Sequence, residues 1–388
     1  MKRTMKVFAG LLLIALPATA EETTGLTEDT IKIGVMAPFS GNAASYSKAE
    51  IGMMAYYEKI NEEGGVNGRM LIAVQEDTAC DPAKGLAAVK KLISQDEVFM
   101  LHGNSCSGVA LAIRPVVEDA GLPWVIAHAA SDSISNPLAP NIFHGLPTGS
   151  ANGRAMAEFV LTRPDTKRVA IIEHSNDWAH SYSDPARAYL KEQGIEPVAD
   201  QTMERGQTDA TAQILKLREA QPDFIIAALY EAETAIFLRD LKKYGMSDIP
   251  VMGTAGTDLE NTLKRVGDLE TVQNYFVIHS YIDSLEGAGL KPWGEMITKY
   301  YPDEQLSTFS FASLGSAVAV VEALQNAGPD LTRSKFIAEL EKINSLETGI
   351  LSHPITFTAD DHQGVKGSAV AGFVDGRPTV LRAWGERY

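Results

Sequence analysis

Serine, histidine and acidic side chains recur along this chain, but their spacing matches no common catalytic motif. A serine-hydrolase elbow needs Gly-x-Ser-x-Gly, whereas residues 103–107 (GNSCS) carry a serine in place of the second glycine. The chain also lacks a Gly-x4-Gly-Lys-Ser/Thr phosphate loop and a His-Glu-x-x-His zinc motif. His174 and His180, with Asp177 between them, could bind a metal, but a polar loop explains them more simply. An enzymatic role is therefore unsupported, and we expect no cofactor and no metal.

The first 20 residues have the layout of an export signal. Three basic residues precede an apolar run at 7–16, and small residues up to Ala20 supply a cleavage site. The run is too short for a membrane span, which needs about 20 residues. We predict a cleaved signal peptide at 1–20; an N-terminal anchor or a buried helix is the alternative.

Both cysteines of the chain, Cys80 and Cys106, lie in the exported part, where thiols are normally oxidised. An even number favours one internal disulfide, which would stabilise the fold by about 3–4 kcal/mol. Two free buried thiols or half of a metal site are the alternatives. His102 is the nearest histidine, but no tight zinc spacing is formed.

Composition and charge narrow the class of partner. Of 388 residues, 45% are hydrophobic and 22% are charged, as in an ordinary globular protein, and the length suggests two lobes or domains. Lys and Arg total 34 against 50 Asp and Glu, so the formal net charge of −16 makes nucleic acid a poor partner. No later stretch approaches 18 uninterrupted apolar residues, so an integral membrane protein is not expected.

Strand-like and helix-like segments alternate through most of the chain, which predicts parallel sheets with right-handed crossovers. The expected strands are at 31–36, 70–75, 98–102, 124–127, 169–172, 224–228 and 251–252. The expected helices are at 46–61, 83–94, 108–120, 185–193, 211–220 and 232–244. The remaining elements are two helices and three short strands, at 311–326, 333–343, 355–358, 369–374 and 379–384. Asp375 and Gly376 are typical of a hairpin turn between the last two strands.

Four ordered segments carry a family resemblance: 33–41 (IGVMAPFSG), 60–69 (INEEGGVNGR), 76–83 (EDTACDPA) and 103–108 (GNSCSG). Together they resemble the periplasmic solute-binding proteins of ABC transporters, of the branched-chain amino acid (Leu/Ile/Val) binding type. The resemblance runs over nearly the whole mature chain. It implies an α/β fold, the type I periplasmic binding fold, with two doubly wound parallel-sheet lobes joined by a three-segment hinge. It also implies a disulfide at positions like Cys80 and Cys106.

The resemblance places the hinge crossings near 144–147, 277–280 and 353–357. Lobe one is then 27–146 plus 280–354, and lobe two is 147–279 plus 355–388. In such folds a ligand lies at the carboxyl ends of parallel strands, next to helix N-termini. The resemblance further implies a periplasmic location and permease subunits of the inner membrane as partners, and we expect a monomer.

Residues that follow the strands of lobe one are expected to hold a ligand carboxylate. Ser107 precedes a helix, and its hydroxyl group and the free backbone N–H groups after it can bind an anion. The resemblance gives ligand contacts to Ser107, to the Ala129 carbonyl and to the Ser131 hydroxyl group. Simple helix caps are the alternative for both serines. Tyr46, in the loop after the first strand, could close over the same pocket.

Lobe two is expected to cover the ligand with an aromatic side chain. The resemblance gives this role to Trp178, which could stack on a flat ligand or shield an apolar tail; ordinary loop packing is the alternative. Tyr230 and Glu231 follow the strand at 224–228, in the matching second loop. Glu231 stands where the family has an aromatic residue.

One departure from the family bears on the ligand. Amino acid binders need an acid that faces the ligand ammonium, and the position of that glutamate corresponds to Ala255 here. An unpaired buried ammonium is costly. Either Asp258 or Glu231 supplies the carboxylate from a shifted place, or the ligand has no α-ammonium. We expect an organic acid, such as an aromatic carboxylate, with branched-chain or other amino acids as the alternative.

The predicted function is that of the substrate-binding component of an ABC importer, which captures a small carboxylate by hinge closure. A ligand sensor that delivers its closed form to a receptor is an alternative of another class. A secreted α/β enzyme that uses Ser, His and Asp from distant loops is a further alternative.

Overall fold

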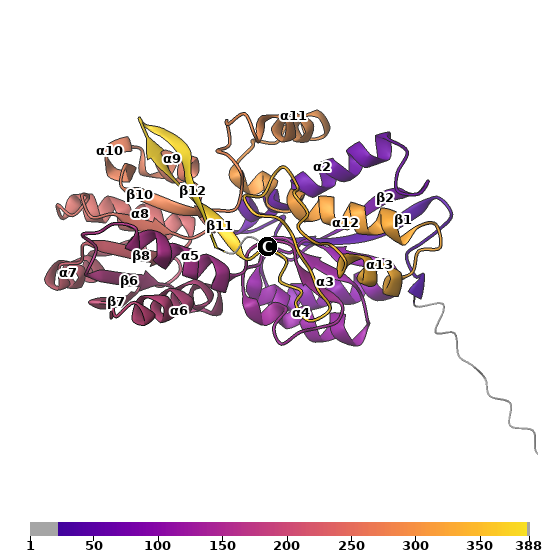
Figure 1. Ribbon diagram of the computed structural model, residues 1–388, viewed down its shortest axis with the longest axis horizontal. Helices are drawn as coiled ribbons and strands as arrows, with labels where there is room; N and C mark the ends of the chain where they lie inside the picture. The colour runs from indigo at the N-terminus through magenta and orange to yellow at the C-terminus, as the bar shows by residue number, and fades with distance from the viewer. Residues whose placement is uncertain (1–21, 386–388) are drawn as a thin grey trace, which may run out of the picture.

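Two β-sheets, each covered by helices, form two lobes that lie side by side (Figure 1). The computed structural model describes residues 22–385, so the predicted signal peptide at 1–20 lies outside the described part. Lobe one carries the sheet formed by residues 30–144, and lobe two carries the sheet formed by residues 169–385.

Lobe one contains five parallel strands in the order β2-β1-β3-β4-β5. They are β1 (Thr30–Ala37), β2 (Met70–Asp77), β3 (Met100–His102), β4 (Trp124–Ile126) and β5 (Ile142–His144). The central strands β3 and β4 are fully buried because helices cover both faces of the sheet. The helices are η1 (Ala44–Ser47), α2 (Lys48–Glu62), α3 (Pro82–Ser94), α4 (Ser107–Asp119) and η2 (Asp132–Ile134).

A later part of the chain returns to lobe one and completes it. Its helices are α11 (Lys291–Tyr300), η3 (Thr308–Phe311), α12 (Leu314–Ala327) and α13 (Arg333–Leu340). Helices α11, η3 and α12 pack on α2, α13 packs on α12, and all four share one hydrophobic core with the sheet. In the described part, the segment Thr308–Ala327 is the one helix long and apolar enough to cross a membrane, and most of it is buried in this core.

Lobe two contains seven strands in the order β12-β11-β10-β9-β8-β6-β7. They are β6 (Val169–Glu173), β7 (Ala199–Thr202), β8 (Phe224–Ala228), β9 (Val251–Gly253), β10 (Tyr275–His279), β11 (Gly367–Val374) and β12 (Arg377–Gly385). Its helices are α5 (Gly149–Leu161), α6 (Asp177–Glu192), α7 (Thr211–Ala220), α8 (Glu231–Lys243), α9 (Leu259–Val266) and α10 (Leu269–Val272). All neighbours are parallel except at β11, which is antiparallel to both β10 and β12.

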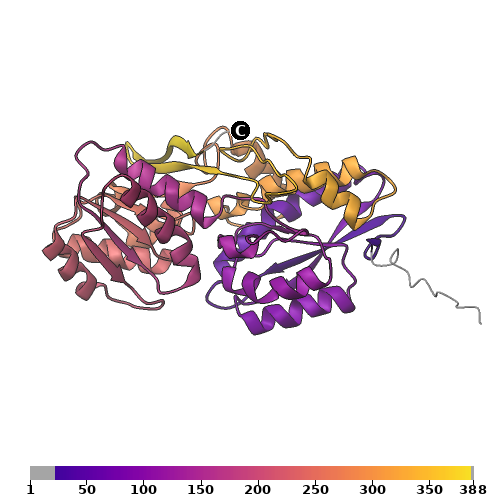
Figure 2. The ribbon, with the colours of Figure 1, turned by 60° about the horizontal axis from the view of Figure 1, so that its bottom comes forward.

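The hairpin predicted at the end of the chain is confirmed. Asp375 and Gly376 have φ values of 50° and 75°, and they join β11 to β12. Left-handed backbone at both central positions is what a tight two-residue hairpin turn requires. Figure 2 shows this hairpin along one side of the molecule, on lobe two.

The chain passes between the lobes after β5, after β10 and just before β11. The third crossing is later than the expected position at 353–357. Ile355, Phe357 and Val365 pack in the core of lobe one, so the segment 355–365 lies with lobe one and not with lobe two. The strand expected at 355–358 forms only isolated bridges.

Helix α6 begins at Asp177, well before the predicted start at 185. The side chain of Asn176 caps it by accepting the N–H of Ala179 at 3.0 Å, and Pro185 stands inside the helix. Trp178 therefore lies in the first turn of a helix and not in the predicted loop.

Candidate ligand-binding site

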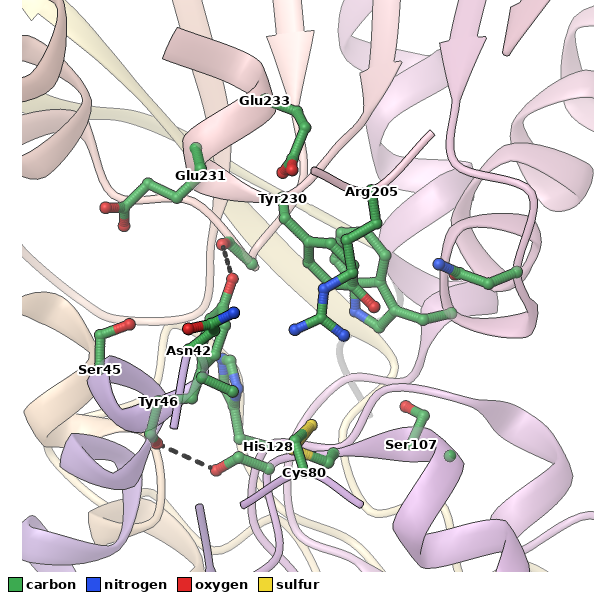
Figure 3. A pocket seen from close by; sticks show the side chains of 18 of the residues that line it. Asn42, Ser45, Tyr46, Cys80, Ser107, His128, Arg205, Tyr230, Glu231 and Glu233 are labelled. Carbon is green, nitrogen blue, oxygen red and sulfur yellow. Dashed lines mark hydrogen bonds between the residues drawn. A yellow bond between two sulfur atoms is a disulfide. The ribbon is translucent and has the colours of Figure 1, made fainter. Parts of the chain in front are cut away.

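A cavity of about 700 Å³ lies between the lobes, and its lining residues come from both (Figure 3). Nearly all of them follow the carboxyl end of a parallel strand or begin the next helix. This is the position where open α/β sheets bind ligands, because strand ends and helix N-termini converge there.

Five of the eight predicted ligand-binding residues line this cavity: Tyr46, Ser107, Trp178, Tyr230 and Glu231. The other three, Ala129, Ser131 and Asp258, are buried and do not line it.

The disulfide between Cys80 and Cys106 is formed, as predicted, and both cysteines line the cavity. The bond ties the loop after β2 to the residue that precedes α4. Cys106 occupies the N-cap position of α4, so Ser107 is the first residue of the helix and not its cap.

The hydroxyl oxygen of Ser107 lies 3.3 Å from the backbone nitrogen of Ser131 and accepts its N–H. The Ser107 hydroxyl proton is therefore left to donate to an acceptor in the cavity. In the described structure the N–H groups of Ser107 and Gly108, at the start of α4, also have no acceptor. These three donors at one helix N-terminus suit a carboxylate.

Ala129 and Ser131 support this corner of the cavity from behind. The carbonyl oxygen of Ala129 already accepts a hydrogen bond from Nε2 of His144 at 2.9 Å. Ser131 reaches Ser107 through its backbone N–H and not through its hydroxyl group. Ser131 also stands at the N-cap of η2, where its side chain makes no capping bond within the described residues.

Aromatic rings from both lobes form one wall of the cavity. Trp178 stacks on Tyr230 with ring centroids 4.3 Å apart, and Tyr46 of lobe one meets Tyr230 at 6.4 Å. A Cβ on Gly256 would lie 2.6 Å from the Trp178 ring, so the absence of a side chain at this position permits the close approach. The wall can stack on a flat ligand or shield an apolar one.

The acids of lobe two that face the cavity are mostly engaged by protein groups. Glu231 forms an ion pair with Arg265 at 2.6 Å; burial raises the pKa of its carboxyl group, and Arg265 opposes that rise. Glu233 accepts the backbone N–H of Gly206 at 2.7 Å. Among the lining acids in the described structure, only Asp177, exposed in the first turn of α6, has no hydrogen-bond or ion-pair partner.

Asp258 lies outside the cavity and connects the lobes. Its carboxylate caps α9 by accepting the N–H of Asn261 at 2.8 Å, and it also accepts the backbone N–H of Thr308 in lobe one at 3.1 Å. It is 1% exposed. The expectation that Asp258 could face a ligand ammonium is therefore wrong, because its oxygens are already used between the lobes.

Two further contacts join the same loop of lobe two to lobe one. The hydroxyl group of Tyr46 donates to the Gly256 carbonyl at 3.4 Å, and His128 forms a hydrogen bond with the backbone of Ala255. Burial lowers the pKa of His128 to about 4, so the ring is neutral at pH 7.

Sequence reasoning missed Arg205, His128, Glu233 and Arg265, which also line the cavity. Arg205 follows β7, a short polar edge strand (ADQT) without the apolar signal of a buried strand. His128 follows β4 directly, and that strand was predicted, so its position was a usable signal.

Comparison with known proteins agrees with this architecture. A family model described as periplasmic binding protein matches residues 30–377. The chain belongs to the periplasmic binding protein family.

Relatives of this binding protein include Leu/Ile/Val-binding protein homolog 7 of Brucella melitensis, which is 26% identical over 328 residues, 81% of this chain and 80% of that protein. One similar solved structure is the branched-chain amino acid binding protein LivJ of Streptococcus pneumoniae in complex with isoleucine. It has a TM-score of 0.79 at 24% sequence identity, and the match covers 93% of this chain and 100% of that chain. A solute-binding protein of R. palustris in complex with 4-hydroxybenzoate has a TM-score of 0.80 at 20% identity, with 93% and 98% covered.

These likenesses confirm the type I periplasmic binding fold and the resemblance to the branched-chain amino acid type. The protein is thus a periplasmic binding protein similar to those of branched-chain amino acid ABC transporters. Members of this family bind small molecules for ABC transporter permeases, and the family implies a location outside the cytoplasm.

Proposed function

We propose that this periplasmic binding protein captures a small organic acid without an α-ammonium group, with an aromatic carboxylate as the best fit, and presents it to an ABC permease. The observation that carries the proposal is the ion pair between Glu231 and Arg265. Glu231 is the acid of lobe two that could replace the glutamate missing at Ala255, and its pairing with Arg265 leaves it unavailable for a ligand ammonium. Hydrogen-bond donors for a ligand carboxylate stay free at Ser107 and Gly108.

Binding proceeds by closure of the lobes and involves no covalent chemistry. The ligand carboxylate first meets the N-terminus of α4 on lobe one. Lobe two then covers the rest of the ligand with Trp178 and Tyr230. The closed form is favoured because the ligand contacts both lobes only in that form. Tyr46 and Asp258 add direct contacts between the lobes.

Proteins of the same fold have been solved both with aromatic acids and with an amino acid. Proteins of R. palustris were solved with benzoate and 4-hydroxybenzoate, whereas LivJ was solved with isoleucine. An amino acid is the second candidate, favoured by the names of the relatives. In this structure its ammonium would need Asp177, the lining acid without a partner in the described part.

A thermal-shift screen of the mature chain, residues 21–388, tests the proposal. The panel contains benzoate, hydroxybenzoates, cinnamates, short aliphatic acids and the branched-chain and polar amino acids. A ligand at a hundred times its Kd stabilises the fold by about 2.7 kcal/mol, which is readily detected. Stabilisation by acids without an amine supports the proposal. Stabilisation by amino acids alone, reversed in Asp177→Asn, contradicts it.

The rest of the proposed account follows the family. The signal peptide at 1–20 is removed on export, and the mature protein works as a monomer in the periplasm. Co-purification with permease subunits, rather than with a sensor kinase, separates the transport role from a sensor role on the same fold.

A further inference from the structure

Arg205 is a cation that lines the cavity and forms no ion pair within residues 22–385. It is exposed in the loop between β7 and α7 and lines the cavity on the lobe two side. Its guanidinium group makes no hydrogen bond or ion pair among the side chains that the structure describes. The contact found for it is with the ring of Tyr230, whose centroid lies 5.4 Å away.

The loop that carries Arg205 is held in place on both sides. The backbone N–H of Met203 donates to the Glu173 carbonyl at 3.0 Å, and the Met203 carbonyl lies 2.6 Å from Nδ1 of His174. On the other side, the backbone N–H of Gly206 donates to Glu233. The backbone on both sides of Arg205 is thus held by fixed partners, and the Arg205 side chain extends into the cavity.

Three carboxylates on this side of the cavity are committed elsewhere, and Asp177, the lining acid without a partner in the described structure, forms no ion pair with Arg205. Glu204 accepts the hydroxyl group of Ser175 at 2.9 Å, Glu233 accepts Gly206, and Glu231 pairs with Arg265. Of the two arginines that line the cavity, Arg265 is therefore neutralised by a protein acid and Arg205 is not. An arginine on an aromatic platform presents a planar fork of donors that matches a carboxylate.

Figure 3 shows the Arg205 side chain reaching from lobe two into the cavity toward lobe one, the lobe in which Ser107 begins α4. A carboxylate bound at Ser107 thus lies on the side of the cavity that Arg205 faces. Such a ligand would join the two lobes through one charged group.

We propose that Arg205 is a specificity-determining residue that recognises the negative charge of the ligand and couples this recognition to closure of the lobes. This inference rests on the proposed binding function. It further states that a neutral isostere, which has the shape of the ligand but no charge, does not form the contact with lobe two that Arg205 provides. The pairing strengthens on closure because water leaves the cavity and an ion pair gains in a drier environment.

Matched pairs of acid and amide test the inference: benzoate and benzamide, 4-hydroxybenzoate and 4-hydroxybenzamide, leucine and leucinamide. Calorimetry measures Kd for the wild type, Arg205→Met, Arg205→Lys and the control Arg218→Met. Arg218 is exposed on α7 in the same lobe and outside the cavity, so its loss changes net charge equally. The melting temperature without ligand checks that each variant folds.

We expect the wild type and Arg218→Met to prefer the acid over its amide at least tenfold. Arg205→Met should lose ten- to a hundredfold in affinity for the acid and change little toward the amide, with Arg205→Lys between. An acid that binds Arg205→Met as tightly as the wild type overturns the inference and leaves the binding function standing. If leucine binds and the aromatic acids do not, the proposed ligand class fails, and the leucine pair still tests Arg205. Failure of every compound to bind the wild type contradicts both proposals.

Discussion

The carboxylate of Asp258 in lobe two accepts both the backbone N–H and the hydroxyl group of Thr308 in lobe one. Both residues are buried, and Asp258 also caps α9. Asp258, which the sequence suggested as a ligand contact, thus links the two lobes. The arrangement of the lobes in this structure is thereby stabilised by contacts of the protein itself.

Removal of the Thr308 hydroxyl group should favour the open form. Thr308→Val keeps the shape and the backbone N–H but deletes a hydrogen bond to a charged acceptor, which contributes about 1.5–3 kcal/mol. Because closure is linked to binding, we expect the affinity for ligand to fall by about tenfold or more. Small-angle scattering should show a larger radius of gyration without ligand. Thr308→Ser, which keeps the hydroxyl group, is the control; equal behaviour of the two variants would argue against the link.

Replacement of Ser107 should weaken binding of an acid by about 1–3 kcal/mol, because its hydroxyl proton is free to donate to the ligand. Ser107→Thr keeps the donor and should retain most of the affinity. Ser131→Ala should have a smaller effect, since Ser131 touches Ser107 through its backbone N–H. Isothermal titration with the best acid of the screen measures all three. A larger loss in Ser131→Ala than in Ser107→Ala would reverse these roles.

A side chain at position 256 should disturb the aromatic wall. The new Cβ of Gly256→Ala would meet the Trp178 ring at 2.6 Å, closer than two carbon atoms can pack. We expect the Trp178–Tyr230 stack to shift and ligand affinity to drop about tenfold, because a misplaced ring costs about 0.5–1.5 kcal/mol in lost stacking and more in lost ligand contact. Tryptophan fluorescence and calorimetry report the two effects. Trp178→Phe in the Gly256→Ala background should recover part of the loss, and no recovery would show that the clash is not with this ring.

Stability should depend on pH through Glu50, which lies behind the cavity. It is fully buried, and its Oε1 accepts the hydroxyl group of Ser105 at 2.7 Å while its Oε2 has no partner in the described structure. Burial raises the pKa of its carboxyl group to about 8, so the folded protein holds a proton that the unfolded chain releases between pH 4.5 and 8. The contribution of Glu50 to stability is therefore largest at low pH and falls as pH rises through that window.

Glu50→Gln removes this titration and should be more stable than the wild type at pH 9 by at least about 1 kcal/mol, with a smaller difference at pH 5. Urea unfolding at both pH values measures the difference. Glu58→Gln, an equal change of charge on the exposed side of α2, is the control. A stability difference that does not grow with pH would mean that Glu50 is ionised in the folded protein.

Local patterns predicted most of the fold because its strands are short apolar runs between amphipathic helices. Helix α7 begins and ends at the predicted residues. The prediction omitted β5, α5, β10, α10 and α11. It also omitted β7, which is polar and lies at a sheet edge, and α9, which is short, so both carry weak local signals. Their positions are set by contacts with distant parts of the chain.

Five residues that the family resemblance and their places after strands assigned to the site line the cavity. Tyr46, Ser107, Trp178, Tyr230 and Glu231 follow strands that the sequence marks clearly. The role of Asp258 depends on Thr308, 50 residues away along the chain, so no local pattern could reveal it. The third hinge crossing was misplaced because the segment 355–365 has strand-like composition but packs on lobe one.

The central claim concerns the charge pattern of the ligand, and a comparison of two Kd values tests it most directly. Calorimetry of the mature protein with 4-hydroxybenzoate and with leucine compares an acid that lacks an ammonium group with one that carries it. We predict that 4-hydroxybenzoate binds at least tenfold more tightly, because Glu231 is paired with Arg265 and position 255 is an alanine. Tight binding of leucine with no measurable binding of 4-hydroxybenzoate would contradict this account.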